Sequence, residues 1–198
     1  MNSREFRALG RVGADNVEAV LHRLRGVCDN AAVGGAPFRE RELYYQIKSA
    51  TSSLSLIARK SLLDEKSPWD LRYYGPVESS RTSPVQNRSC IQAATSEQLP
   101  QFLQEMGFLL QNELEFEGFC FLKGKYKVSL YKVIRINTKG DKQEAGQARI
   151  FEFSTVVSTG QGQEATVAEM NAFIDHLKPL VNFHPGGRAE RGDAGAAS

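Results

Sequence analysis

Cysteine and histidine, the usual ligands of structural zinc, are scarce in this sequence of 198 residues, with three of each. The cysteines, Cys28, Cys90 and Cys120, are far apart, and no C-x-x-C pair occurs. Structural zinc sites bring four Cys or His ligands together, usually at short spacings along the chain. We therefore expect no zinc site and no cofactor, and three reduced thiols in an intracellular protein.

Long hydrophobic runs and an excess of one charge are also missing. No apolar stretch approaches the roughly 20 residues that span a bilayer, and the amino terminus lacks the apolar stretch of a secretory signal. The 25 Lys and Arg residues nearly balance the 23 Asp and Glu residues, which leaves a net charge of +2. Domains that follow a nucleic-acid backbone usually carry a concentrated basic stripe. We expect a soluble protein with no membrane partner and no direct nucleic-acid partner.

Enough hydrophobic sequence is present, 41% of the residues, for one core of ordinary size. We divide the chain into a flexible amino-terminal arm over 1–14, a single domain over 15–183 and a tail over 184–198. The tail consists largely of Gly, Ala and charged residues, so it has little to bury and is predicted to be disordered.

Three capping boxes, each with a short polar residue three positions before Glu or Gln, predict the starts of three helices. The pairs are Asp15 with Glu18, Thr95 with Gln98, and Thr166 with Glu169. On the central helix one face is predicted to be buried, and it carries Leu99, Phe102, Leu103 and Met106. Gly107 ends this helix, and Pro179 ends the last one.

Alternation of apolar and polar residues predicts strands on both sides of the central helix. The predicted strands are 42–49, 53–63, 69–74, 89–94, two long runs between Gly107 and Asn137, and 148–159. Their connections are predicted to be a flexible connector at 31–37, a surface loop at 75–87 and a hairpin loop at 138–147.

The order of these elements favours one antiparallel sheet, because no repeat and no strand–helix–strand rhythm occurs. Several strands carry apolar side chains on both faces, so both faces must be at least partly covered. A sheet that closes on itself and carries helices on its outside meets this requirement without leaving edges exposed. We predict an α+β fold, an antiparallel multi-stranded β-barrel with about three flanking helices.

Glu40 and Glu42 lie two residues apart at the start of the first predicted long strand, so their side chains point to the same face. Two carboxylates on a barrel wall can hold a divalent cation against a polyphosphate. The pair resembles the E-x-E-x-K signature of triphosphate tunnel enzymes, but Tyr44 stands where the signature has lysine. We favour a solvated strand edge, and a metal-dependent polyphosphate or triphosphate phosphohydrolase stays as the alternative.

Basic residues on the strand after Gly124 would be the other requirement of such a tunnel. Lys125, Lys127 and Arg135 share the same parity, but Tyr131 and Val133 interrupt the row. We expect these basic side chains on an outer, solvated face, and we predict no catalytic residue. The segment 69–74 instead favours binding, because Trp, Tyr and Arg are enriched at interface hot spots. Trp69, Arg72 and Tyr74 are the predicted partner interface.

Six segments in order resemble the subunit 18 family of the Mediator complex, a component of its head module. They are HRLRGVCDN (22–30), PWDLRYYG (68–75), ATSEQL (94–99), QEMGF (104–108), YKVIRI (131–136) and LKPLV (177–181). They are spread over about residues 15–183 of the chain. The loops at 31–38, 76–88 and 138–147 differ from the relatives.

The resemblance implies a barrel related to the triphosphate tunnel fold but without catalytic residues. It also implies pairing with Mediator subunit 20, a barrel of related shape, and capture of a carboxy-terminal helix of Mediator subunit 8. Contacts with other head-module subunits would link the chain indirectly to RNA polymerase II in the nucleus. The leading hypothesis is therefore a non-enzymatic docking subunit that supports regulated transcription.

Overall fold

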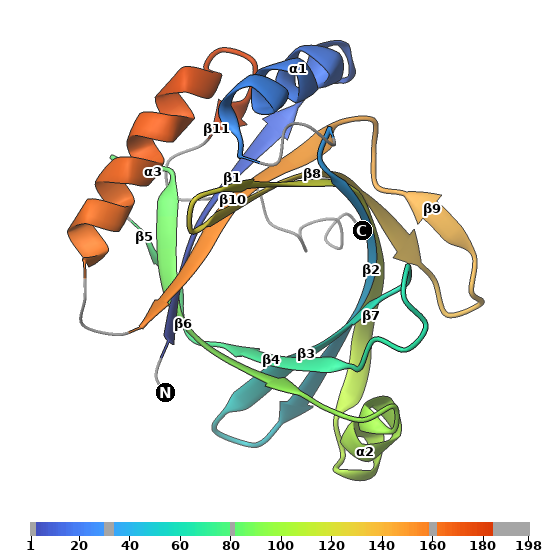
Figure 1. Ribbon diagram of the computed structural model, residues 1–198. Helices are drawn as coiled ribbons and strands as arrows, with labels where there is room; N and C mark the ends of the chain where they lie inside the picture. Colours follow the sequence, from blue (N-terminus) through green and yellow to red (C-terminus); the bar gives the residue numbers. More distant parts are fainter. Residues whose placement is uncertain (1–2, 30–33, 80–81, 159–161, 184–198) are drawn as a thin grey trace.

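Eight strands form a closed antiparallel barrel, and three helices lie on its outside (Figure 1). The computed structural model describes residues 3–29, 34–79, 82–158 and 162–183. Around the barrel the strands are β1 (Ser3–Val12), β10 (Arg149–Ser158), β8 (Tyr126–Ile136), β7 (Leu109–Lys123), β2 (Ala36–Lys48), β3 (Ser53–Ser61), β4 (Asp70–Tyr74) and β6 (Val85–Ala94). Pairing of β6 with β1 closes the ring. The predicted α+β barrel is confirmed.

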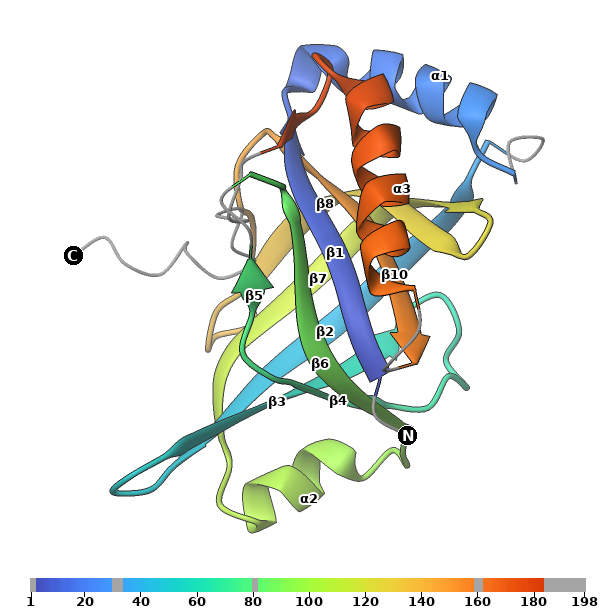
Figure 2. The same cartoon turned by 90° about the vertical axis from the view of Figure 1, so that its left-hand side faces the viewer.

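Three short strands and three helices complete the fold. Their bounds are β5 (Glu78–Ser79), β9 (Lys142–Glu144), β11 (Asn182–Phe183), α1 (Val17–Val27, after a 3-10 turn at Ala14–Asn16), α2 (Leu99–Glu105) and α3 (Gln163–Leu177). Figure 2 shows α3 lying along the barrel wall, where it contacts β1 and β6. Within the described ranges, no helix has both the length and the apolar character needed to cross a bilayer.

The largest core lies between the barrel wall and the helices α1 and α3. Its buried members include Phe6, Val12, Val20, Leu24, Phe121, Val128, Phe151, Phe153, Met170, Ile174 and Leu177. A second core lies under α2, where Leu43, Tyr45, Ala58 and Trp69 of the wall region meet Leu99, Leu103 and Phe108. The apolar faces of these strands therefore point outward, toward the helices.

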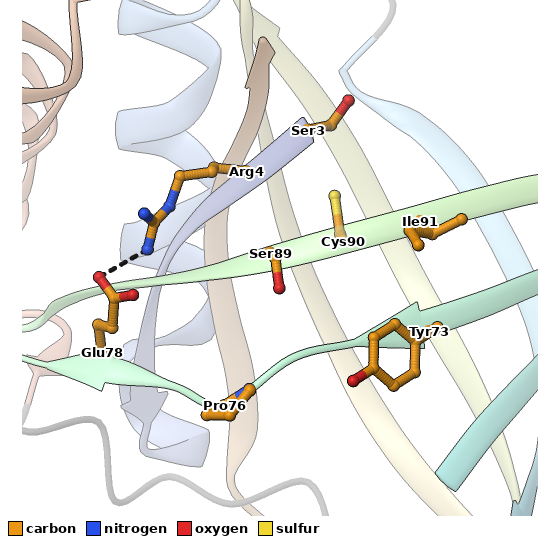
Figure 3. Close-up of a pocket in the computed structure, with 8 residues that line it drawn as sticks. All are labelled: Ser3, Arg4, Tyr73, Pro76, Glu78, Ser89, Cys90 and Ile91. Atoms are coloured by element: carbon orange, nitrogen blue, oxygen red, sulfur yellow. Dashed lines mark ion pairs between the residues drawn. The ribbon is translucent and has the colours of Figure 1, made fainter. Parts of the chain in front are cut away.

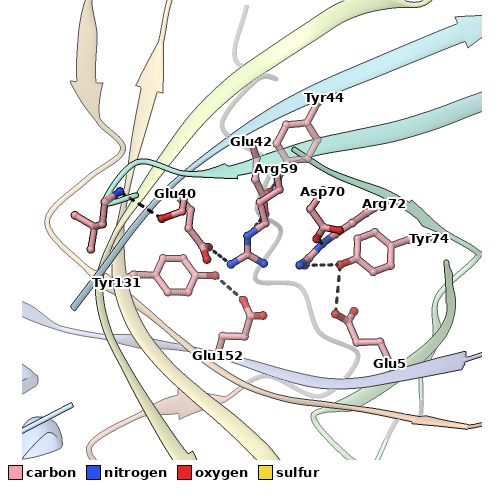
Figure 4. Close-up of polar contacts among 12 residues, drawn as sticks. Glu5, Glu40, Glu42, Tyr44, Arg59, Asp70, Arg72, Tyr74, Tyr131 and Glu152 are labelled. Carbon is pink, nitrogen blue, oxygen red and sulfur yellow. Dashed lines mark hydrogen bonds and ion pairs between the residues drawn. The ribbon is translucent and has the colours of Figure 1, made fainter. Parts of the chain in front are cut away.

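The predicted flexible arm at 1–14 is wrong, because Ser3–Val12 is strand β1, paired with both β10 and β6. Phe6, Ala8 and Val12 pack under the helices, and Glu5 lies among the polar residues of the barrel interior (Figure 4). Charged and apolar residues alternate along β1, as expected of a strand that packs one face under the helices and turns the other face to a polar interior. The predicted tail at 184–198 lies outside the described residues.

Two predicted loops contain strands. The segment 75–87 includes β5 and the first residues of β6, and the segment 138–147 includes β9. Strand β2 begins at Ala36, six residues before the predicted start, and takes in part of the predicted connector at 31–37. Residues 31–33 of that connector lie outside the described ranges. Pairing with the distant strand β7 extends β2, whereas β5 and β9 pair with strands close in the sequence, β6 and β8.

The three predicted capping boxes are wrong, since none of the helices has a side-chain hydrogen bond at its N-cap. Thr95 donates its hydroxyl to the carbonyl of Trp69, 2.9 Å away, and so ties the approach to α2 onto β4. Helix α3 begins after Gly162, and the Thr166 N–H already donates within its first turn. Helix α1 begins after Asn16, one residue beyond Asp15.

Candidate functional site: the barrel interior and the outer faces

The interior of the barrel is lined by polar and charged side chains from several strands (Figure 4) and by the apolar Phe38 and Phe116. On β2, Leu43 and Tyr45 pack outward in the core under α2, so Glu40 and Glu42 point inward. The shared face predicted for the two glutamates is confirmed, but the solvated strand edge is wrong. Glu42 is only 2% exposed.

An arginine faces this glutamate pair and compensates one of its two negative charges. Arg59 of β3 forms an ion pair with Glu40, and its Nε atom lies 3.9 Å from Oε1 of Glu42. Tyr44, which replaces the signature lysine, donates its hydroxyl to Oε2 of Glu42 at 2.6 Å. The carboxylates that could coordinate a cation are thus engaged by side chains of the same chain.

Little free space remains around this group. The cavity has a volume of about 10 Å³, and its lining includes Glu40, Glu42, Arg59, Tyr131 and Glu152. Room for one water molecule takes roughly 10–15 Å³, so this cavity by itself does not hold a polyphosphate. Tyr131 donates to Glu152 at 2.7 Å, a contact between the neighbouring strands β8 and β10. In the described part of the chain, no three His, Cys, Asp or Glu side chains are grouped as metal ligands.

Lys127 also lies in this interior, so its predicted place on an outer, solvated face is wrong. Burial lowers the pKa of Lys127, and the nearby positive charge of Arg59 lowers it further. The Nζ atom lies 5.6 Å from the ring centroid of Phe38. Its position follows from the register of β8, whose alternate residues Tyr126, Val128 and Leu130 pack outward in the core under α1 and α3.

A second polar group occupies the interior beside β4, β6 and β1 (Figure 4). Arg72 donates to Asp70 at 2.7 Å and to the Tyr74 hydroxyl at 3.4 Å. The guanidinium of Arg88 stacks 3.4 Å from the ring centroid of Tyr74 and pairs with Glu5 at 2.6 Å. Burial lowers the pKa of Arg72, but Tyr74 and Asp70 raise it more, so the net shift is upward and the group stays charged.

The three predicted interface residues do not share one surface. Trp69 is 7% exposed and lies in the core under α2. Arg72 and Tyr74 point to the opposite side of the wall, into the interior. The structure brings Arg72 and Tyr74 together and separates both from Trp69.

Helix α2 carries an exposed apolar surface that the sequence analysis missed. Phe102 and Met106 were predicted to be buried with Leu99 and Leu103, but they are 55% and 57% exposed. We call Phe102, Met106, Leu109 and Leu110 the α2 patch; all four are exposed. Spacing gave no signal of this, because positions 99, 102, 103 and 106 fall on one helical face.

The outer wall between these helices is polar or shallowly grooved. On β2 and β7, Arg41 pairs with Glu113 at 2.5 Å, and Glu115 receives hydrogen bonds from Arg39 at 2.9 Å and Lys142 at 2.7 Å. Figure 3 shows a groove of about 390 Å³ on another part of the wall. Its lining residues are Ser3, Arg4, Tyr73, Pro76, Glu78, Ser89, Cys90 and Ile91, and the Arg4–Glu78 ion pair spans 2.6 Å.

Comparison with known proteins identifies the family. The profile of the Med18 protein family matches residues 45–185. Mediator of RNA polymerase II transcription subunit 18 from Xenopus laevis is 37% identical over 188 residues, which cover 92% of this chain and 88% of the relative. The chain belongs to the Med18 family. The Drosophila melanogaster protein of the same name is 34% identical over 194 residues, with the same coverage of the two chains. This Med18 chain is therefore a Mediator component.

Solved structures share the fold. A chain in the Schizosaccharomyces pombe Mediator head module matches with a TM-score of 0.71 at 18% identity, covering 91% of this Med18 chain and 97% of the other. A protein from Hippeastrum described as a putative adenylyl cyclase with a dominant triphosphatase activity matches with a TM-score of 0.55 at 11% identity, covering 96% and 93%. The predicted relation to the triphosphate tunnel fold is confirmed.

Proposed function

We propose that this Med18 chain is a non-enzymatic docking subunit of the Mediator head module. In this proposal it binds Mediator subunit 20 and the carboxy-terminal helix of Mediator subunit 8, contacts RNA polymerase II indirectly through other subunits, and works in the nucleus. Family membership and the fold shared with a head-module chain support the assembly.

The observation that carries the non-enzymatic part is the ion pair of Arg59 with Glu40 inside the barrel, together with the small volume around it. A hydrolase of this geometry would need free carboxylates and space for a phosphate chain. Arg59 supplies the positive charge that a cation would otherwise supply. The interior then serves to hold the barrel wall together.

The α2 patch supports the docking part. Four large apolar side chains within nine residues are exposed there, and exposed apolar side chains that gather on a surface typically mark an interaction site. A helix with apolar anchors at i and i+4, or a groove that receives one, is a recurrent mode of protein recognition.

Co-expression with head-module subunits tests the proposal. The expected result is a stoichiometric complex with subunits 8 and 20 and a higher melting temperature of this chain, because a partner that binds only the folded state stabilises it by mass action. At a partner concentration 100 times the Kd the gain is about 2.7 kcal/mol. A chain that stays monomeric and gains no stability with both partners present contradicts the proposal.

A metal-dependent triphosphate phosphohydrolase is the second candidate. The inward-pointing Glu40 and Glu42, and the fold shared with triphosphatase-like proteins, favour it. Release of phosphate from tripolyphosphate or a nucleoside triphosphate with Mg²⁺ or Mn²⁺, lost in Glu40→Ala, would establish this candidate. Glu97→Ala, which changes an exposed glutamate paired with Lys60, is the matched control.

A further inference from the structure

Strand β7 extends beyond its neighbour β8 and leaves one edge open. Pairing of β7 with β8 begins only at Glu113, opposite Ile136, where β8 ends. On the other edge β2 pairs as far as Leu109. Within the described ranges, no strand pairs with the β8-facing edge of residues 109–112. We call these four residues the β7 overhang; Figure 2 shows β7 starting from the end of α2.

A groove of about 480 Å³ follows this open edge. One wall is β7 itself, from Leu110 to Leu114. The opposite wall is the end of β8 and the turn into β9, with Ile136, Asn137 and Gln143. The groove therefore lies where β8 would run if it continued past Ile136. Its walls combine apolar and amide side chains with three charged ones, Glu113, Arg135 and Asp141.

The backbone of the β7 overhang is irregular and partly satisfied by a side chain. Tyr44 pairs with Asn112 but Tyr45 pairs with Leu110, so Gln111 is the extra residue of a bulge. The Nε2 atom of Gln111 donates to the carbonyl of Leu109 at 3.3 Å. A backbone N–H of a partner could take the place of this side-chain donor at small net cost, since one hydrogen bond to the carbonyl replaces another.

The overhang is short and bulged, two features that protect an open strand edge, but it lacks the charged residues and proline that also do so. Natural edges carry charged residues or proline, or are covered, whereas the sequence here is Leu-Leu-Gln-Asn. Leu109 is 68% exposed and Leu110 is 42% exposed. An edge of this kind takes up an extended segment by strand addition, in which backbone hydrogen bonds give affinity and alternate side chains give specificity.

We propose that the β7 overhang is a docking site for an extended segment of a partner protein, which adds to the sheet as a short strand beside residues 109–112. The segment alternates apolar side chains, which contact Leu110 and Ile136, with polar ones that face Asn137 and Gln143. A partner helix does not meet the open backbone groups, because its own backbone groups are paired internally. The inference adds an extended ligand to the proposed docking function.

Hydrogen exchange of the backbone amides tests this site in the assembled head module. Amides in 109–112 are expected to exchange about tenfold more slowly in the reconstituted module than in the isolated chain, because a paired amide exchanges only on opening. A photo-crosslinking residue at position 111 should then label partner residues spaced two apart, as in a strand.

Two substitutions sharpen the test. Leu110→Asp should remove the protection, whereas Leu122→Asp should keep it, since Leu122 is similarly exposed, at 49%, but lies on β7 where β8 pairs with it. Gln111→Ala leaves the edge open and should bind at least as tightly. Melting temperatures of the isolated variants show whether each one folds, and loss of protection in Gln111→Ala, the milder change, would count against the site.

Each remaining outcome overturns the inference. An assembled module without protection of 109–112 overturns it and leaves the proposed function standing. Crosslinked partner residues spaced three or four apart would show that a helix occupies the groove. Hydrogen-exchange protection of 109–112 that rises with the concentration of the isolated chain would show that a second copy of the chain covers the edge. A chain that does not assemble overturns the proposed function and, with it, the partner segment.

Discussion

The Nε atom of Arg59 lies 3.9 Å from Oε1 of Glu42, and the same guanidinium pairs with Glu40. Because these groups lie inside the barrel, water screens their charges only weakly. The three side chains therefore depend on one another. Removal of Arg59 leaves both carboxylates without their cation.

Arg59→Met is expected to destabilise the protein strongly, by about 3–5 kcal/mol, since it leaves buried glutamates without their cation. Urea unfolding measures the free energy. The neighbouring Lys60→Met is the control, because Lys60 pairs with the exposed Glu97 and such pairs contribute about 0–1 kcal/mol. The triple variant with Glu40→Gln and Glu42→Gln should recover most of the loss, and equal instability of Arg59→Met and Lys60→Met would refute this account.

Adjacent residues on α2 should separate stability from binding. Leu103→Ala removes a side chain from the core under α2 and should cost about 2–5 kcal/mol of unfolding free energy. Phe102→Ala changes an exposed side chain and should stay within about 0.5 kcal/mol of the wild type. If the α2 patch docks a subunit, Phe102→Ala should weaken the complex about tenfold, measured by titration with the partner. Unchanged affinity would remove the patch from the docking surface.

Glu115 stabilises the barrel in its charged form, and this contribution should be lost in acid. Burial raises its pKa, but hydrogen bonds from Lys142 and Arg39 lower it more, so the folded-state pKa lies below the ordinary 4.5. The charged form is thus favoured by folding: its contribution is complete above pH 4.5 and is lost as the pH falls through the folded-state pKa.

Urea unfolding of Glu115→Gln at several pH values measures this dependence. The variant should be less stable than the wild type at pH 7, and the difference should shrink as the pH falls below the ordinary pKa of glutamate. Glu117→Gln, in which the lost partner is Lys132 at 3.5 Å on a more exposed part of the wall, should show a smaller effect. A difference independent of pH would exclude this role for Glu115.

Two glycines should respond to alanine in opposite directions. A Cβ atom at Gly118 would lie 2.1 Å from the carbonyl oxygen of Leu130, so Gly118→Ala should force β7 and β8 apart and cost at least about 1–3 kcal/mol. Gly26 lies in α1, and among the described residues nothing beyond its own helix backbone and chain neighbours lies within 4 Å of such a Cβ. Gly26→Ala should therefore stabilise by about 0.4–1 kcal/mol. Thermal unfolding of both variants provides the comparison, and a stable Gly118→Ala would show that the strands separate easily there.

Local patterns predicted most strands and the approximate extents of all three helices. The stripe Met170, Ile174 and Leu177 on α3 and the alternation in β8 needed no distant information, because helical and extended periods are properties of short segments. The helix starts were less predictable. Thr95 bonds to Trp69 across the fold, so a side chain suited to capping was engaged elsewhere.

The candidate site was recognised only in part. A spacing of two places Glu40 with Glu42 and Asp70 with Arg72 on common faces, and this much can be read from one strand. The partners of these residues cannot be read from one strand. Arg59 meets Glu40 because β2 pairs with β3. Arg88 meets Glu5 because β6 pairs with β1, across some 80 residues of sequence. Charges repeated at alternate positions on several strands were the available sign of a polar interior.

The amino-acid sequence by itself determined most of the elements, their antiparallel arrangement and the family resemblance, since each depends on periodicity or local residue identity. Tertiary structure alone decided which face of each strand is the inside. Helices cover the outer apolar faces, so closure of β1 against β6 turns the charged faces inward and makes them compensate one another. An isolated strand has two faces, and neither is inside or outside. Only closure of the ring makes one face the interior.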